Sequence, residues 1–403
     1  MESLWKNDNW WVSPFNYHQD VLKISTIPEN LQFHDVTLRD GEQTPGVVFR
    51  KEEKIEIARK LDEAGVHRIE AGMPAVSEED RFAIEQIRKL DMKAQIYAFA
   101  RPLESDINLC RDCGVQGLII EVPIGKPKLQ YQFKYGIEQA LENSQKAVEF
   151  AKAAGLKVVL FPYDATRAQA EDIEFYLNGL TGSYKPDSIG LVDTMGCATP
   201  QAISYMVKWY KEKLNIPVEI HVHNEFNMSV AASIAALHAG AEVVHCCING
   251  LGERTGNTPL EDIAAALQLL YGFNTGIDIG KIVDLCQDVA RMSNYPIAAK
   301  KSVTGSDIFV RESGIGADMV TSKPLAMFAV NPPFYKQKGS LVLGKKSGLL
   351  SIETKLEEMG ISLDREIRKK ILGEVKNFGI EHKRHLTHEE FVEIVERVSK
   401  EGQ

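Results

Sequence analysis

Short runs of apolar, often β-branched residues recur along the chain from residue 31 onward, and each run has the length of a buried strand. The longer segments between them place apolar residues at i, i+3 and i+4, the pattern of a helix with one buried face. The runs are eight in number, at residues 31–38, 67–73, 93–100, 114–123, 156–164, 187–194, 218–224 and 242–249. The clearest helical segments are 51–64, 78–89, 136–153 and 228–239. The pattern therefore predicts strands that alternate with helices.

The number and regularity of these units distinguish two α/β architectures. Eight strand–helix units over about 240 residues are typical of a closed parallel (β/α)8 TIM barrel, in which right-handed crossovers place the helices outside. An open doubly wound sheet is the alternative, but it normally carries a glycine-rich phosphate turn after its first strand. The first predicted strand instead ends in TLRDGE, at residues 37–42. We therefore predict a TIM barrel as the catalytic domain over residues 31–272.

Two further segments flank the predicted barrel. After residue 272 the chain changes to stretches punctuated by Gly and Pro and then to charged helical segments, so residues 273–403 are expected to form a smaller α/β or helical module. Residues 1–30 hold three of the four tryptophans, and we expect this aromatic arm to pack either on a second subunit or on the barrel's own helices. No long regulatory domain is expected.

Composition narrows the classes of function. Lys and Arg number 47 against 56 Asp and Glu, and the net charge of −9 disfavours nucleic-acid binding. No apolar run approaches the roughly 18 residues of a membrane helix, and the N-terminus lacks the order of a signal peptide. The six cysteines are too scattered for a disulfide framework. We therefore expect a cytoplasmic protein with reduced thiols and no membrane contact.

Polar side chains follow several predicted strands at the end where barrel enzymes hold their active sites. His221 and His223 lie two apart on one strand, so both imidazoles point to the same face. Asp40 follows the first strand, and Asn257 lies in a glycine-rich loop after the last one. Two nitrogens, a carboxylate and an amide oxygen suit one divalent cation, Zn²⁺, Mn²⁺, Co²⁺ or Mg²⁺. Taken alone, the histidines are equally compatible with a hydrogen-bonded structural pair.

Longer motifs around these residues carry a family resemblance. HDVTLRDGEQTPG, at residues 34–46, resembles the first signature of the isopropylmalate, homocitrate and citramalate synthases. HVHNE at 221–225 and GERTGN at 252–257 resemble the second. Weaker matches are IEAGMP, DATR, DTMG and LGKKSG, at residues 69–74, 164–167, 193–196 and 343–348. The same family includes the related Re-citrate synthases and hydroxymethylglutaryl-CoA lyases.

This resemblance implies a Claisen-type condensation of an acyl-CoA, usually acetyl-CoA, with a 2-oxo acid on a divalent metal. It implies that Asp40, His221 and His223 hold the metal. Asn257 is then in or near the coordination shell, and the oxo acid completes the coordination through its carboxylate and keto oxygens.

The same resemblance assigns roles to four further residues. Arg39 is expected to hold the oxygen that gains negative charge, and Glu70 to pair with that arginine. Thr194 and Arg167 are expected to grip the carboxylate end of the oxo acid. The alternative for each of these last two is a local cap at the end of a strand.

The sequence departs from the family in its C-terminal part. Relatives usually end a Glu-Ser-Gly-Ile-His stretch with a histidine that transfers protons, whereas here the stretch ends in Gly316. General-base catalysis typically contributes about 10²–10⁴ in rate, so another group is expected to take the role. We favour Glu121, at the end of the fourth strand, over Asp318 and Glu312.

A second departure is the loop after the fourth strand, which reads GKPK at residues 125–128 where the family commonly has serine and histidine. Lys126 and Lys128 either meet an extra substrate carboxylate or a CoA phosphate, or are solvated loop lysines. Because this loop helps to select the oxo acid in the family, the identity of that acid stays open.

We therefore predict an acyltransferase that makes a homocitrate-, citramalate-, citrate- or isopropylmalate-type acid, as in amino-acid biosynthesis. One alternative is a lyase of the hydroxymethylglutaryl-CoA type, although Cys246 and Cys247 precede the loop where such lyases carry a cysteine. Another is a catalytically idle homologue, suggested by Gly316. In relatives the C-terminal module reaches over a neighbouring subunit's barrel, so a homodimer is expected.

Overall fold

The computed structural model describes residues 4–401, which fold into two compact units. The barrel unit comprises residues 15–297, and the terminal unit joins the N-terminal residues up to 14 with the chain from residue 298. The expected aromatic arm, residues 1–30, is therefore divided between them. The barrel unit also extends beyond residue 272, because Lys60 pairs with Asp288 and the amide of Asp278 donates to the carbonyl of Ala64.

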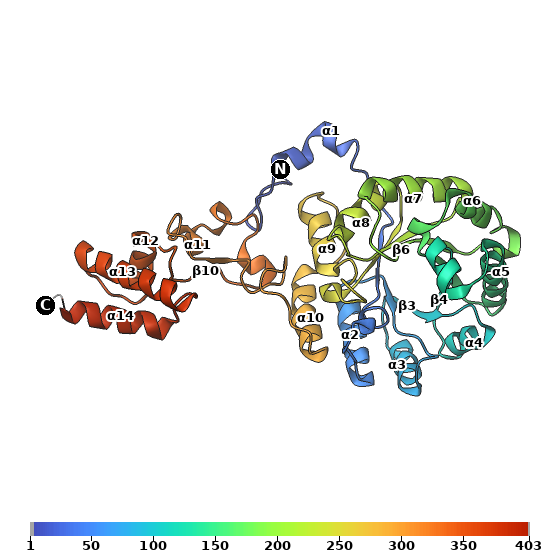
Figure 1. Ribbon diagram of the computed structural model, residues 1–403, viewed down its shortest axis with the longest axis horizontal. Helices are drawn as coiled ribbons and strands as arrows, with labels where there is room; N and C mark the ends of the chain where they lie inside the picture. The colour runs from blue at the N-terminus through green and yellow to red at the C-terminus, as the bar shows by residue number, and fades with distance from the viewer. Residues whose placement is uncertain (1–3, 402–403) are drawn as a thin grey trace. The chain divides into compact units, whose positions relative to one another are not determined.

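Eight parallel strands form a closed barrel in chain order (Figure 1). They are β1 (Gln32–Asp35), β2 (Arg68–Glu70), β3 (Gln95–Ala100), β4 (Gly117–Pro123), β5 (Lys157–Tyr163), β6 (Ser188–Asp193), β7 (Val218–Val222) and β8 (Val243–Cys246). β1 closes the ring by pairing with β8, with His34 opposite His245. The predicted TIM barrel is confirmed, and the open doubly wound sheet is excluded.

Helices surround this ring on the outside (Figure 1). They are α2 (Lys51–Glu63), α3 (Glu78–Lys89), α4 (Glu104–Asp112), α5 (Ile137–Ala153), α6 (Ala170–Asn178), α7 (Pro200–Leu214), α8 (Ser229–His238), α9 (Leu260–Leu269) and α10 (Ile279–Met292), with the short α1 (Gln19–Leu22) before the barrel. The sequence sets their ends locally: the Thr199 hydroxyl accepts from the amide of Ala202 at the start of α7, and Pro200 occupies its first turn.

The terminal unit is mainly helical, with a two-stranded parallel sheet of β9 (Val310–Arg311) and β10 (Ser340–Leu341). Its helices are α11 (Met319–Ser322), α12 (Leu349–Glu358), α13 (Arg365–His382) and α14 (His388–Glu401). Ile352, Ile371 and Val375 lie at the centre of its apolar core. Trp10 bridges to Val330 and packs edge-on against Phe334, so the first part of the aromatic arm belongs to this unit. Among the described residues, no helix is both long and apolar enough to cross a bilayer.

Candidate metal and substrate site

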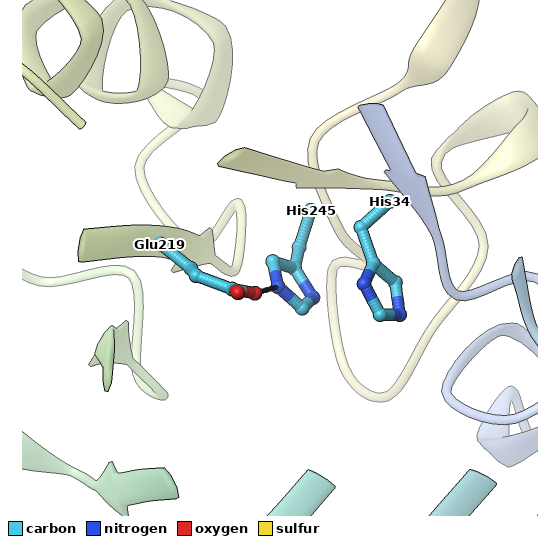
Figure 2. A group of neighbouring side chains, drawn as sticks. All are labelled: His34, Glu219 and His245. Atoms are coloured by element: carbon cyan, nitrogen blue, oxygen red, sulfur yellow. Dashed lines mark hydrogen bonds and ion pairs between the residues drawn. The ribbon is translucent and has the colours of Figure 1, made fainter. Parts of the chain in front are cut away.

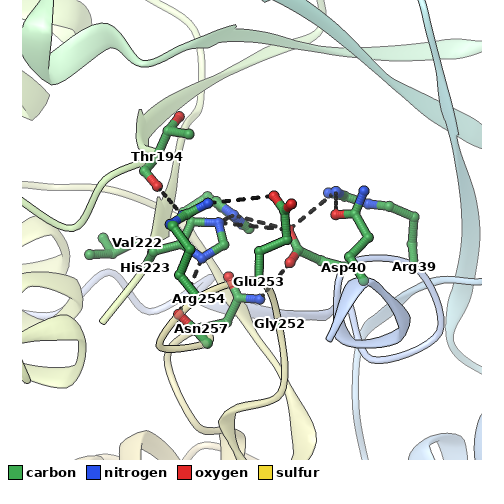
Figure 3. A network of polar contacts seen from close by, with 12 residues as sticks. Arg39, Asp40, Thr194, Val222, His223, Gly252, Glu253, Arg254 and Asn257 are labelled. Carbon is green, nitrogen blue, oxygen red and sulfur yellow. Dashed lines mark hydrogen bonds and ion pairs between the residues drawn. The ribbon is translucent and has the colours of Figure 1, made fainter. Parts of the chain in front are cut away.

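Three potential metal ligands meet at the carboxyl end of the barrel strands. His221 lies in β7 and His223 follows it, so strand alternation points both rings inward, and Asp40 comes from the turn after β1. The Nε2 atoms of His221 and His223 lie 3.4 Å apart, and the Oδ2 atom of Asp40 lies 3.5 and 3.9 Å from them. Figure 3 shows Asp40 facing His223 and Asn257. All three side chains are buried.

The protonation states of this group suit a cation. Burial lowers the pKa of His221 and His223, which keeps both imidazoles neutral. His223 Nδ1 lies 3.2 Å from the carbonyl oxygen of Gly256, and donation there leaves the Nε2 lone pair free to bind a metal. Burial would raise the pKa of Asp40, but the nearby Arg39 and histidines outweigh it and lower the pKa below its ordinary value. The group therefore offers two neutral nitrogens and one carboxylate.

Asn257 lies against this group. Its Nδ2 donates to Asp40 Oδ1 at 2.8 Å and to the carbonyl of Leu251 at 3.0 Å, which fixes the amide's orientation. Its buried Oδ1 has no hydrogen-bond partner in the described part of the chain, so this oxygen is available to a cation or a ligand. Gly252 permits the approach, because a Cβ there would lie 2.3 Å from Asn257 Nδ2 and the backbone has φ +147°.

Arg39 connects the candidate metal ligands to Glu70. Its Nε donates to Glu70 Oε1 at 2.5 Å and its Nη1 to Asp40 Oδ2 at 3.2 Å. The guanidinium also lies 4.4 Å from the centre of the Phe99 ring. Burial alone would lower the pKa of Arg39, but the two carboxylates raise it, so the side chain stays charged.

A cavity of about 300 Å³ opens above these groups. Its lining residues are Arg39, Asp40, Gln43, Phe99, Glu121, Lys128, Gln132, Tyr163, Val192, Thr194, Met195, His221, His223, Glu253 and Arg254. Withdrawal from bulk water raises the pKa of Glu121 to about 7, although Arg39 opposes this. One carboxyl group that can exchange a proton near neutral pH thus shares a cavity with the candidate metal ligands.

A second polar group lies deeper in the barrel (Figure 2). His34 and His245 stack with ring centres 4.3 Å apart, and His245 Nε2 lies 2.7 Å from Glu219 Oε2. Glu219 Oε1 also accepts from Arg68 Nη1 at 2.8 Å. Stacked rings do not direct their lone pairs to a common point, and the Arg68 charge opposes a cation. We therefore interpret this group as a structural layer beneath the site, in which Arg68, Glu219 and His245 are hydrogen-bonded and His34 stacks on His245.

Comparison with known proteins gives the family. The HMGL-like family profile matches residues 30–289. Homocitrate synthase AksA of Methanocaldococcus jannaschii is 38% identical over 400 residues, covering 99% of this chain and 96% of the relative. The chain belongs to the HMGL-like family.

Further comparisons are consistent with this assignment. The 2-isopropylmalate synthase of Methanocaldococcus jannaschii is 37% identical over 94% of this chain and 73% of its own length. The hydroxymethylglutaryl-CoA lyase structure from Pseudomonas aeruginosa aligns with a TM-score of 0.61 over 67% of this chain and 95% of that one, and its 20% identity supports the fold alone. The predicted family resemblance is confirmed.

Most of the residues predicted from the sequence lie in or beside this cavity, but Arg167 does not. Thr194 lines the cavity, and its hydroxyl accepts from the amide of Asp164 at 2.7 Å. Arg167 does not line the cavity; it forms two 2.7 Å hydrogen bonds with Asp164, the strand-end alternative considered from sequence. The resemblance had assigned no role to Arg254, which hydrogen-bonds the carbonyl of Thr194, or to Tyr163, which ends β5. Their strand-end and motif positions are the signals that could have indicated them.

Proposed function

We propose that this protein condenses acetyl-CoA with a 2-oxo acid at a divalent cation and releases CoA, as expected of an acyltransferase among homocitrate and isopropylmalate synthases. The main support is the convergence of Asp40, His221 and His223 in one cavity with a charged arginine and a carboxyl group of near-neutral pKa. The relatives' names support the reaction class.

The protein's donors define what the cation site can do. Asp40, His221 and His223 would hold Zn²⁺, Mn²⁺, Co²⁺ or Mg²⁺, with Asn257 Oδ1 at the edge of the shell. A bound divalent cation supplies Lewis acidity to a keto group. Arg39 would hold the keto oxygen as it gains negative charge, and Glu70 fixes the guanidinium for this task.

Glu121 is our candidate for the general base. In its ionised form it would accept a proton from the methyl group of the acyl-CoA, and the resulting carbanion would form the new bond to the keto carbon. The electron pair of the C=O bond moves to the oxygen beside Arg39, and that oxygen gains a proton from solvent as Glu121 loses its proton to solvent. Water then hydrolyses the thioester, which releases CoA as a thiol. Thr194 would orient the carboxylate end of the oxo acid, whereas Arg167, which is paired with Asp164 and does not line the cavity, is left out of this role.

The alternatives have weaker support. In the described structure Cys246 and Cys247 are fully buried, and burial raises the pKa of both thiols, so neither is placed as a reactive loop cysteine. A catalytically idle homologue has no need of an unpartnered Asn257 oxygen beside neutral histidines. We also propose that the protein acts in the cytosol as a homodimer; its six free cysteines agree with a reducing compartment.

Release of CoA thiol tests this function directly. Metal-loaded protein mixed with acetyl-CoA and a panel of 2-oxo acids should release thiol, and chelation of the metal should stop it. His223→Ala should lose both metal and turnover, whereas His238→Ala, on α8 outside the cavity, should keep both. Full metal occupancy in His223→Ala would remove the proposed ligand set, and no thiol release with any oxo acid would remove the proposed reaction.

A further inference from the structure

The cavity holds three cationic side chains, and they differ in their partners. Arg39 is paired with Glu70 and Asp40, and Arg254 is paired with Glu225 and the carbonyl of Thr194. Lys128 has no carboxylate partner among residues 4–401; its Nζ donates to the Gln132 side-chain oxygen at 3.1 Å. Lys128 is therefore the cationic side chain of this cavity that has no ion-pair partner among the described residues.

Local structure holds Lys128 in this position. A single π-helical segment, Lys128–Phe133, follows β4, and such turns are frequent at functional sites. Leu129 is buried and anchors the turn, while the Lys128 ammonium lies 5.9 Å from the centre of the Tyr163 ring. Lys126, two residues earlier, is exposed and does not line the cavity. The structure thus separates two lysines that looked equivalent in sequence.

The chemistry of a 2-oxo acid gives this charge a use. The proposed function accounts for the first carboxylate and the keto oxygen through the cation, Arg39 and Thr194. An aliphatic end would bring no opposite charge to the half-buried Lys128 ammonium, whose hydrogen-bond partner in the described structure is the exposed, uncharged Gln132 side chain. A second anionic group would form a charge-assisted hydrogen bond with both.

We propose that Lys128 determines specificity by binding a second carboxylate at the far end of the substrate, so that the protein acts on 2-oxo dicarboxylic acids. This inference rests on the proposed function for the placement of the oxo-acid end. Gln132 would orient the ammonium and donate its own amide to the same carboxylate, while Tyr163 forms the wall beside it.

The test compares two substrate classes in metal-loaded protein. Thiol release is measured with 2-oxoglutarate and oxaloacetate, and with the monocarboxylic pyruvate and 2-oxoisovalerate. Wild-type protein should prefer a dicarboxylic acid in kcat/KM. Lys128→Met keeps the length of the side chain but removes its charge, and it should reduce this preference by a factor on the order of 10²–10³, mainly through KM. Lys128→Arg should restore part of it, and Lys126→Met should leave it unchanged.

Three results would overturn the inference. The first is a preference of the wild-type protein for monocarboxylic acids, and the second is an equal loss of kcat/KM for both substrate classes in Lys128→Met. The third is a rise in the KM for acetyl-CoA in Lys128→Met without a change in the KM for the oxo acid, which would assign Lys128 to a CoA phosphate. Calorimetric binding of 2-oxoglutarate separates this inference from the reaction. Binding that weakens in Lys128→Met without any thiol release would uphold the anion site and reject the condensation, whereas binding unaffected by the substitution would reject the anion site.

Discussion

Asp40 and Glu121 are carboxylates in the same cavity, yet their neighbours give them opposite protonation behaviour. Arg39 and the two histidines hold the pKa of Asp40 low, whereas withdrawal from water raises the pKa of Glu121 to about 7. A carboxylate that stays ionised suits a metal ligand, and one that titrates near neutrality suits a general base. Residue environment therefore separates two roles that residue type alone does not.

Arg39→Lys tests whether the guanidinium acts on the reaction. We expect kcat to fall on the order of 10²–10³ with unchanged metal content, because an ammonium cannot contact Glu70, Asp40 and the developing oxyanion together. Arg88→Lys, on the outer helix α3, is the matched control. A near-normal kcat in Arg39→Lys would show that Arg39 is only a structural partner of Glu70. Circular dichroism checks that the variant keeps its fold.

Glu121→Gln tests the assignment of the base. The variant should lose exchange of the acetyl-CoA methyl protons with deuterated solvent while still binding metal and oxo acid. In wild-type protein kcat/KM should rise with pH as Glu121 loses its proton, with a midpoint at or below pH 7, since a bound cation favours the carboxylate. This limb should vanish in Glu121→Gln and persist in Glu253→Gln. Unchanged exchange would assign the base elsewhere.

At the scale of elements, the sequence predicts the barrel and the convergence of its candidate metal ligands for a simple reason. Period-two alternation places His221 and His223 on one face, and strand order places Asp40 at the same rim. The ends of the strands were less predictable. The first apolar run covers residues 31–38, but β1 ends at Asp35. The carboxylate of Asp35 accepts hydrogen bonds from both the amide and the hydroxyl of Thr37. Such local side-chain bonds compete with the ladder and leave little trace in hydrophobic pattern.

The positions of two cationic side chains could not be predicted from the sequence. Arg167 lies in the expected motif, but Asp164 adopts a left-handed backbone conformation and its carboxylate forms an ion pair with the guanidinium of Arg167. Lys128 enters the cavity through a π-helical turn that no periodicity predicts. In both cases the side chain's direction depends on local backbone geometry, at Asp164 and over Lys128–Phe133, which is set by the packed fold.

β7 also carries the layer beneath the site, since Glu219 shares a face with His221. Burial would raise the pKa of Glu219, but hydrogen bonding from His245 and the Arg68 charge lower it to about 2. Glu219→Gln leaves Arg68 without its ion partner and should cost about 3–5 kcal/mol in the free energy of unfolding at pH 7, measured by urea denaturation. Glu142→Gln, which removes an exposed pair on α5, should have no measurable effect.

The pH dependence of that cost has a definite sign. A folded pKa below the ordinary 4.5 stabilises the protein above that value, and the stabilisation is lost as pH falls toward 2. The difference between wild type and Glu219→Gln should therefore be constant above about pH 5 and shrink below it. A difference that grows on acidification would show that Glu219 is protonated in the folded protein.

At the scale of the whole molecule, the terminal unit has its own apolar core. Its sequence departs from the family pattern at Gly316, where relatives usually carry a proton-transferring histidine. Gly316 has φ +72°, and a Cβ there would lie 2.7 Å from Met327 Sδ, so the backbone has adapted to glycine. The neighbouring Ile315 is 84% exposed. Family resemblance leads us to expect that this stretch meets the barrel of a second subunit.

Subunit complementation tests that expectation. Light scattering should give a dimer, and Ile315→Glu should lower turnover without lowering the melting temperature, because an exposed side chain contributes little to its own fold. Mixing Ile315→Glu with His223→Ala should restore about a quarter of wild-type turnover, since half of the dimers are then mixed and each has one intact site. Mixing His223→Ala with Arg39→Lys should restore nothing, because both changes lie in the barrel. A fully active monomer, or no recovery in the first mixture, would show that each chain completes its own site.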